Sequence, residues 1–136
     1  VGVPIMTDDM VATPYDAMNV IRLGAADRVK VKVTKHGFDG ARAICAMLSS
    51  AGLTPVLGHV FEMGLAAIAE AQFAACTPGL AMPCEIGSMA PMGTHADIVT
   101  NDRRSVPGYM TVPTGFGLGA DVDWRRVRRG ASESAA

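Results

Sequence analysis

Residues 27–37 read DRVKVKVTKHG, and this short stretch decides the fold. With the period of two that a strand has, its three valines share one face, while Lys30 and Lys32 lie on the other. A solvated lysine face would be ordinary in an antiparallel sheet. Helical patterns flank this strand on both sides along the chain, however, and they favour a parallel strand covered by helices. The valines are then expected to pack on the helices and the lysines to point away from them.

Strand and helix patterns alternate along most of the chain. Short apolar runs predict strands, and longer periodic stretches predict helices: strands at 1–6, 28–33, 54–61 and 81–89, helices at 13–24, 38–52 and 63–79. Such alternation predicts right-handed βαβ units and an α/β fold with a parallel sheet. Beyond residue 105 the alternation stops. Residues 106–136 are expected to form a closing segment with a short strand, a glycine-rich loop and a last helical turn at 123–129.

The boundaries of two expected helices can be read from single residues. Thr13 can cap the first helix, Pro14 suits its first position, and Asp16 stands three residues after the cap. Gly24 suits its C-terminal end. Asp39 is the candidate cap of the second helix.

A polar, chemically capable residue ends or follows each expected strand. These residues are Asp8, Lys32, His59 and Glu85, at intervals of 24, 27 and 26 residues. In a (β/α)₈ barrel, catalytic groups come from the carboxyl ends of several strands. A complete barrel has eight units, so about four units predict half of a barrel over residues 1–105, with these side chains at one mouth.

Each of these residues also has an ordinary structural explanation. Acidic residues such as Asp8 and Asp9 are favourable ahead of a helix N-terminus because of the helix dipole. A single histidine such as His59 is often a hydrogen-bonded core residue, and Glu85 in an apolar strand needs either a cation or an opening to solvent. The regular spacing, rather than any one residue, indicates a shared site.

Composition argues against several classes of function. Twelve Lys and Arg residues balance 13 Asp and Glu residues, so no net charge attracts nucleic acid or an anionic membrane. The basic cluster WRRVRRG, residues 124–130, lacks an aromatic platform and indicates a solvated helix face. The three cysteines include no CxxC pair, and no apolar run has membrane-spanning length. We expect a cytoplasmic protein without nucleic-acid or membrane partners.

The segments that carry these residues also resemble a known family. Residues 4–64, the phrase KxxKxG at 32–37 and the phrase VPxGxGLG at 112–119 resemble the mandelate racemase and muconate lactonizing enzyme family of the enolase superfamily. The resemblance implies strands five to eight of a TIM-type barrel. It also implies Mg²⁺-dependent removal of the proton α to a carboxylate through an enediolate, by a racemase or epimerase, a cycloisomerase or a dehydratase.

The resemblance assigns roles by position. Asp8 matches a metal-ligating carboxylate, Lys32 matches the catalytic lysine, and Glu85 matches an acid that contacts the substrate carboxylate or lies beside the reacting centre. GHVFEMG, residues 58–64, is similar to the phrase that holds the histidine base of mandelate racemase, but the aspartate that pairs with that histidine is replaced here by Lys32. His59 is therefore expected to contact substrate, to act as an auxiliary acid or to have no role. A lysine partly buried beside a metal ion is expected to have a lowered pKa.

Several parts of the family pattern have no counterpart in these 136 residues. They are the N-terminal capping domain, the first half of the barrel and two further metal ligands. The resemblance implies that these parts are partners of this chain and complete the Mg²⁺ site, and that the full-length protein is a homo-oligomer acting on a small carboxylate. Alone, the chain is expected to be inactive and to associate through two open sheet edges.

Two other functions remain open. The chain could be a catalytically dead homologue kept for binding or assembly, which the sequence upstream of Val1 would reveal. A receiver-like signalling module would suit the acidic pair in IMTDDM, residues 5–10. That module needs an aspartate after its third strand and a lysine after its fifth, whereas this chain has His59 and places Lys32 after the second.

Overall fold

The computed structural model describes residues 2–86, 97–100 and 108–133. A parallel sheet with strand order β1-β2-β3 forms its centre, and its strands are β1 (Met6–Thr7), β2 (Arg28–Val31) and β3 (Thr54–Leu57). A helix follows each strand, and a fourth helix ends the chain: α1 (Pro14–Leu23), α2 (Val33–Ser50), α3 (Gly64–Cys76) and α4 (Trp124–Glu133). The predicted α/β class and parallel sheet are confirmed.

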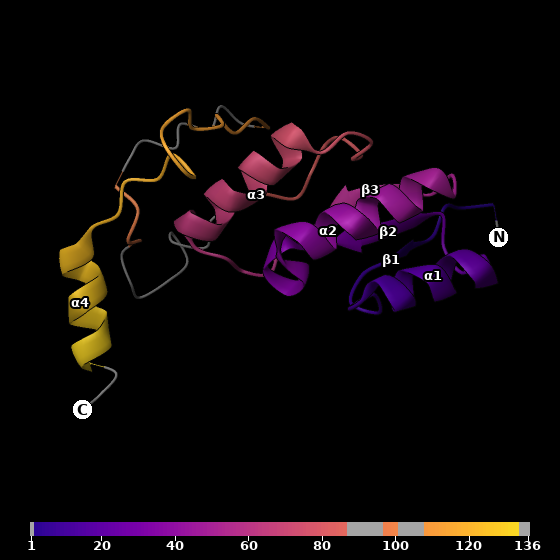
Figure 1. Ribbon diagram of the computed structural model, residues 1–136, viewed down its shortest axis with the longest axis horizontal. Coiled ribbons are helices and arrows are strands. Elements are labelled where there is room, and N and C mark those ends of the chain that lie inside the picture. The colour runs from indigo at the N-terminus through magenta and orange to yellow at the C-terminus, as the bar shows by residue number, and fades with distance from the viewer. Residues whose placement is uncertain (1, 87–96, 101–107, 134–136) are drawn as a thin grey trace.

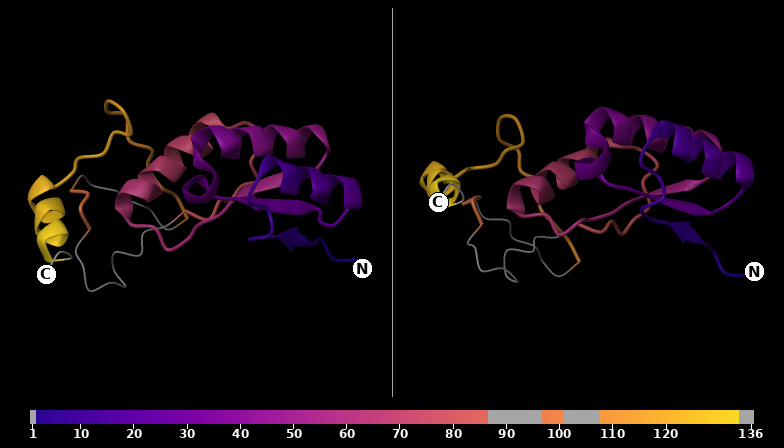
Figure 2. Two further views of the ribbon diagram at one scale, coloured as in Figure 1. Left: turned by 60° about the horizontal axis from the view of Figure 1, so that its bottom comes forward. Right: turned by 90° about the horizontal axis from the view of Figure 1, so that it is seen from below.

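Helices α1 and α2 lie together along one face of the sheet (Figures 1 and 2). Val29 and Val31 of β2 are fully buried there, together with Ile44 and Leu48 of α2. Burial of a Val, Leu or Ile side chain contributes about 1.5–3 kcal/mol to stability, so this layer forms the core. The prediction that the valines face the helices is confirmed.

The boundaries of α1 are those that the sequence predicts. The Thr13 hydroxyl accepts a hydrogen bond from the backbone N–H of Asp16 at 3.2 Å, and the Asp16 carboxylate accepts one from the N–H of Thr13 at 2.8 Å. Gly24 ends the helix with φ 55°, in the left-handed region. The capping box and the terminal glycine act within a few residues, so the sequence alone locates them.

A short helical turn precedes the predicted helix in α2, and Gly37 separates the two. The expected strand runs to residue 33, but β2 ends at Val31, and Lys32 stands at the N-cap position of the helix without a capping hydrogen bond from its side chain. Gly37, with φ 66°, interrupts the helix after its first turn, which glycine allows at little steric cost. The prediction that Asp39 caps this helix is wrong, because Asp39 lies inside it and its carboxylate accepts a hydrogen bond from Arg42 at 2.9 Å.

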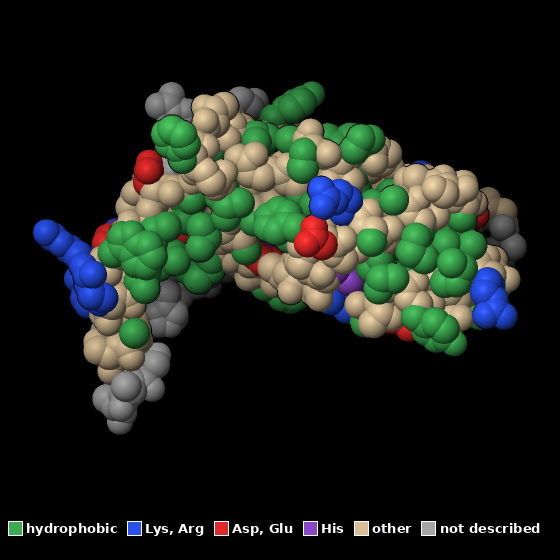
Figure 3. Space-filling model, viewed as in Figure 1, with side chains coloured by type: hydrophobic (Ala, Val, Ile, Leu, Met, Phe, Trp, Pro, Cys, Tyr) green, Lys and Arg blue, Asp and Glu red, His purple; other side chains and the backbone are tan. Residues whose placement is uncertain are grey.

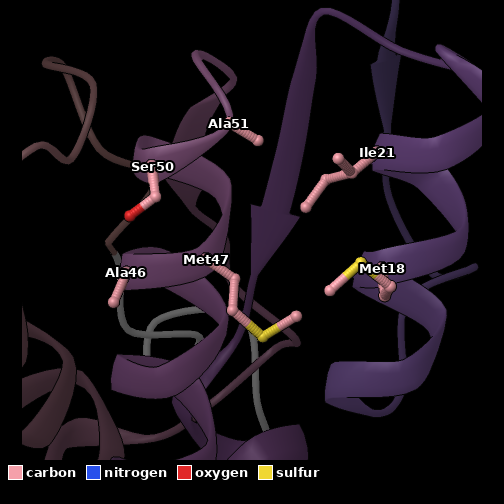
Figure 4. A pocket seen from close by; sticks show the side chains of 6 residues that line it. All are labelled: Met18, Ile21, Ala46, Met47, Ser50 and Ala51. Atoms are coloured by element: carbon pink, nitrogen blue, oxygen red, sulfur yellow. The ribbon is translucent and has the colours of Figure 1, made fainter.

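A shallow apolar groove separates the outer surfaces of α1 and α2 (Figure 4). The side chains of Met18 and Met47 point toward each other across it. Ser50 is its one polar lining side chain, and hydrophobic side chains cover much of this face of the molecule (Figure 3). This groove belongs to the helix-covered face, and the lysines of β2 project from the other face.

The fourth predicted strand, residues 81–89, is not found among the described residues, and residues 87–89 lie outside them. The chain nevertheless runs beside β3, because the N–H of Ala81 donates to Pro55 O at 2.8 Å and that of Glu85 to Leu57 O at 3.0 Å. The expectation of two open sheet edges is therefore wrong at β3. The described residues contain three βα units; about four were predicted, and the fourth extends into residues 87–96, which lie outside the described part.

The closing segment packs on α3 without a strand in its described part. The Gln72 amide donates to the carbonyl oxygens of Pro113 at 2.6 Å and Leu118 at 3.1 Å. One antiparallel bridge joins Val99 to Val122, so the short strand predicted after residue 105 is not observed at 108–124. The last helical turn predicted at 123–129 extends to Glu133 as α4, which lies at the end of the molecule away from the sheet (Figure 1).

The proposed boundary between residues 105 and 106 lies outside the described residues and stays a prediction. Among the helices that the structure describes, none is long and apolar enough to cross a membrane.

Candidate functional site

Charged side chains from the ends of neighbouring strands meet at the carboxyl edge of the sheet. Lys32 Nζ lies 2.6 Å from Asp8 Oδ1 and 2.9 Å from Asp9 Oδ1. Lys30 Nζ lies 2.9 Å from Glu85 Oε1 and 3.4 Å from Asp8 Oδ2. Asp8 therefore bridges both lysines, and the structure brings together three of the four residues that the sequence singled out.

The lysines form the buried part of this site. The side chains of Lys32 and Lys30 are 7% and 11% exposed, whereas those of Asp8 and Glu85 are 46% and 53% exposed. The ammonium groups thus lie at the floor and the carboxylates reach solvent. An approaching cation would meet the carboxylates first, and an anion could contact the lysines only by competing with these ion pairs.

The ion pairs set the pKa values of the groups in the site. Burial lowers the pKa of Lys32, but the hydrogen bonds to Asp8 and Asp9 outweigh burial and raise it above its ordinary value. Burial likewise raises the pKa of Asp8, and the hydrogen bond from Lys32 and the charge of Lys30 bring it below its ordinary value. Two carboxylates contact the Lys32 ammonium group here, and the expected lowering of its pKa beside a bound metal ion stays a prediction.

Gly58 leaves the space that Lys30 occupies. A Cβ atom at residue 58 would lie 2.3 Å from Cγ and 2.4 Å from Cδ of Lys30, and 3.3 Å from Cε of Lys32. Both distances to Lys30 are far below van der Waals contact. The lysine stems of β2 therefore depend on a glycine immediately after β3, which sequence reasoning did not identify.

His36 and Lys35 fix the backbone around the site. The Nε2 atom of His36 is 2.9 Å from Val11 O, and its Nδ1 atom is 2.8 Å from Lys32 O. Lys35 Nζ donates to Asp9 O at 2.7 Å. These contacts join the loop after β1 to the start of α2, and so hold Asp9 and Lys32 in place.

His59 belongs to a second cluster, which we call the His59 cluster and which comprises His59, Glu62 and Glu70. The Nδ1 atom of His59 lies 2.7 Å from Glu62 Oε2 and 3.4 Å from Glu70 Oε2. The Thr34 hydroxyl donates to the other oxygen of Glu62 at 2.6 Å. In the described part of the chain, no hydrogen bond or ion pair joins His59 to Lys32, and its ion-pair partners are Glu62 and Glu70 instead.

The two carboxyl groups of the His59 cluster have opposite pKa shifts. Burial, followed by the charge and hydrogen bond of Glu62, raises the pKa of Glu70 to about 8. Burial also raises the pKa of Glu62, but hydrogen bonds from Thr34 and the N–H of Val60 outweigh it and lower that pKa. Glu70 was missed at the sequence level, although α3 is apolar nearly all round and a charged residue in such a helix is expected to be buried.

The first site offers ligands for Mg²⁺ but not a complete set. Mg²⁺ prefers hard oxygen ligands in octahedral geometry and is commonly bound by one or two carboxylates. Asp8 and Asp9 supply such oxygens, and the 46% exposure of the Asp8 side chain gives a cation access to it. The donor chemistry of these two residues fits Mg²⁺, and further ligands have to come from elsewhere.

A family profile identifies this arrangement. The profile described as "Enolase C-terminal domain-like" matches residues 1–126. The chain belongs to this family. The match confirms the resemblance seen in the sequence and identifies the sheet and its helices as part of the TIM-type barrel of enolase-superfamily proteins.

Curated relatives of the chain are enzymes of this superfamily. The chain is 31% identical over 129 residues to muconate cycloisomerase 1 of Rhodococcus opacus, covering 94% of the chain and 34% of the relative. It is 38% identical over 117 residues to the L-Ala-D/L-Glu epimerase of Bacillus subtilis (strain 168), covering 85% of the chain and 31% of the relative. The chain thus spans about a third of the length of the relatives it matches.

Solved structures show the same fold. The 2-chloromuconate cycloisomerase of Rhodococcus opacus 1CP superposes with a TM-score of 0.84 at 28% identity, covering 95% of the chain and 35% of that structure. A substrate-liganded complex of the L-Ala-D/L-Glu epimerase from Bacillus subtilis gives a TM-score of 0.76 at 29% identity, covering 88% of the chain and 33% of that structure.

A side chain at residue 58 is expected to disturb the lysines of β2. We expect Gly58→Ala to lower the free energy of unfolding by about 1–3 kcal/mol in urea denaturation, because its Cβ overlaps the Lys30 stem. Gly40→Ala is the matched control, since its Cβ would lie 3.5 Å from His36 Cβ, an ordinary contact. In a helix interior this control should leave stability unchanged or raise it by up to about 1 kcal/mol. A similar loss of stability in both variants would show that overlap with the Lys30 stem is not its cause.

The pKa of Glu70 predicts a pH-dependent loss of stability. Between about pH 4.5 and 8 the unfolded chain releases the Glu70 proton and the folded chain keeps it, so this group lowers stability as pH rises through that window. Glu70→Gln cannot ionise, and its stability relative to the parent should rise with pH up to about 8. Urea denaturation in the presence of a metal chelator measures this. A flat difference for Glu70→Gln would refute the prediction.

Proposed function

We propose that this chain provides the lysine base, one Mg²⁺ ligand and a substrate-facing acid to an enolase-superfamily enzyme that removes the proton α to a carboxylate. The observation that carries the proposal is the contact of Lys32 with Asp8, a base and a hard oxygen ligand at the ends of adjacent parallel strands. The reaction class is racemisation or epimerisation, cycloisomerisation or dehydration of a small carboxylate. Cycloisomerase and epimerase relatives support this range.

Lys32 acts as the base in this proposal, and it can accept a proton only as the neutral amine. Its contacts with Asp8 and Asp9 favour the protonated form, which cannot accept a proton. Asp8 would hold the cation, and a cation there would offset the negative charge that raises the pKa of Lys32. Bound Mg²⁺ would supply positive charge that stabilises the negative charge developing on the substrate oxygens, the enediolate oxygens of the implied reaction.

Lys30 holds Glu85 in a defined position. The ammonium group of Lys30 lies 2.9 Å from Glu85 Oε1 and is supported from the other side by Asp8. Glu85 remains 53% exposed and so can contact a bound substrate. We assign Glu85 to substrate contact, Lys30 to its positioning, and no direct role in proton removal to His59.

The enzyme in this proposal also needs parts that the family has and residues 1–136 do not supply. The proposal places residues 1–105 in strands five to eight of the barrel and 106–136 in the closing segment. The capping domain, the first half of the barrel and the remaining Mg²⁺ ligands are the partners of this chain, and the full-length enzyme is a cytoplasmic homo-oligomer.

Replacing Lys32 should abolish proton removal without removing the metal site. The protein translated from the complete open reading frame is incubated in deuterated buffer with Mg²⁺ and either an Ala-Glu dipeptide or a muconate, and α-deuterium incorporation is followed by NMR. Lys32→Met is expected to lower the exchange rate by about 10²–10⁴-fold, the range typical of a general base, and to retain Mg²⁺ binding.

Arg42→Met is the control, since the Arg42 side chain is 73% exposed on α2 and pairs only with Asp39 among the described residues. Its exchange rate should match that of the parent. Undiminished exchange by Lys32→Met would exclude Lys32 as the base. If the parent protein exchanged the α-proton of neither substrate, the proposed reaction class would be without support.

The 136-residue chain on its own is expected to catalyse no exchange in the same assay. Asp8 and Asp9 alone do not complete the coordination of Mg²⁺, so the charge on the substrate oxygens would go unstabilised. Measurable exchange by the purified chain would show that the other parts of the barrel are dispensable. DNA sequence upstream of Val1 that encodes a KxK strand and two further strand-end carboxylates would support the enzyme over a binding module.

A further inference from the structure

The His59 cluster has the ligand types and spacing of a metal site, at a place other than the one used in the proposed reaction. One ligand atom each from His59, Glu62 and Glu70 lies within 4.8 Å of the others. The imidazole and both carboxylates come from two pieces of the chain, the loop after β3 and the middle of α3. A cation held here would join that loop to the helix.

Burial leaves polar atoms of this cluster without partners. Glu70 is 0% exposed, and its Oε1 atom has no hydrogen-bond partner. The Nε2 atom of His59 is also buried and unpartnered. An unsatisfied buried polar atom costs about 1–3 kcal/mol, so the described protein groups do not account for this arrangement by themselves.

Neighbouring groups orient Glu62 toward the cluster. The Thr34 hydroxyl donates to Glu62 Oε1 at 2.6 Å, and the backbone N–H of Val60 donates to Oε2. Hydrogen bonds of this kind orient carboxylate ligands in metal sites and are a regular part of their construction. Glu62 is therefore held with Oε2 facing His59 Nδ1, at 2.7 Å.

We propose that His59, Glu62 and Glu70 bind a divalent transition-metal ion with the coordination chemistry of Zn²⁺. Imidazole nitrogen and carboxylate oxygen are both ordinary Zn²⁺ ligands, and three protein ligands with one open position form a common type of site. A dication neutralises two ionised carboxylates beside a neutral histidine. The imidazole ligand also favours Zn²⁺ over Mg²⁺, which separates this site from the one at Asp8.

Cobalt provides a spectroscopic test of this site. The protein translated from the complete open reading frame is stripped of metal with a chelator, dialysed and titrated with Co²⁺, which absorbs visible light strongly in tetrahedral sites. We expect saturable absorption that Zn²⁺ abolishes by displacement. Glu70→Gln keeps the shape of the side chain and His59→Gln keeps it polar; each removes a ligand and should weaken Co²⁺ binding by at least about tenfold, because even the loss of a group that only orients a ligand costs 10–100-fold.

Asp8→Asn is the matched control, because it removes the candidate Mg²⁺ ligand and leaves the His59 cluster intact. It should retain the Co²⁺ absorption, and circular dichroism checks that each variant is folded. Absence of the absorption in the folded parent, or its persistence in both cluster variants, would overturn the proposal.

A second measurement needs no variant. Zn²⁺ added to the stripped parent protein should shift the ring NMR signals of His59. Those of His36, whose nitrogens contact the carbonyl oxygens of Val11 and Lys32, should not change. Unchanged His59 signals at saturating Zn²⁺ would refute the site, whatever the outcome of the α-proton exchange assay.

Discussion

Two nearly buried ammonium groups on one strand constrain the rest of the structure. The side chains of Lys30 and Lys32 point away from the helix-covered face of β2. Their ammonium groups lie in a nearly buried region where an unpaired charge would be costly. Carboxylates have to reach them, and Asp8 and Glu85 do so from the chain on either side of β2. This is possible because the strands are parallel, so that their carboxyl ends lie at one edge. Gly58 completes the arrangement by leaving room for the lysine stems.

The sequence alone predicts those features of the fold that depend on residues close together in the chain. Thr13, Asp16 and Gly24 locate α1 because each acts within one helical turn. The helix predicted from residue 38 follows the interruption at Gly37, and the helical turn before it was missed because the strand pattern of the sequence continues to Val33. Residues 81–86 run beside β3 and donate hydrogen bonds to it without forming a regular strand, a distinction that an apolar pattern does not contain.

The sequence predicts those members of the candidate site that stand at the carboxyl ends of strands. Asp8, Lys32 and Glu85 meet because each stands at the carboxyl end of its strand or predicted strand, and the spacing along the chain already shows that. The partners of Lys30 required the three-dimensional structure, since either neighbouring strand could have supplied them. His59 has the same sequence spacing, but its side chain contacts Glu70 of α3. The sequence does not predict this contact, because the position of Glu70 depends on how that helix packs.

The side-chain amide of Gln72 joins α3 to the glycine-rich closing segment. Its nitrogen donates to two carbonyl oxygens, those of Pro113 and Leu118. Deamidation, which converts glutamine to glutamate in ageing proteins, would replace this donor by a carboxylate that can only accept hydrogen bonds when ionised. Negative oxygens would then face carbonyl oxygens, so a slow chemical change at one residue would turn two attractive contacts between α3 and the closing segment into repulsive ones.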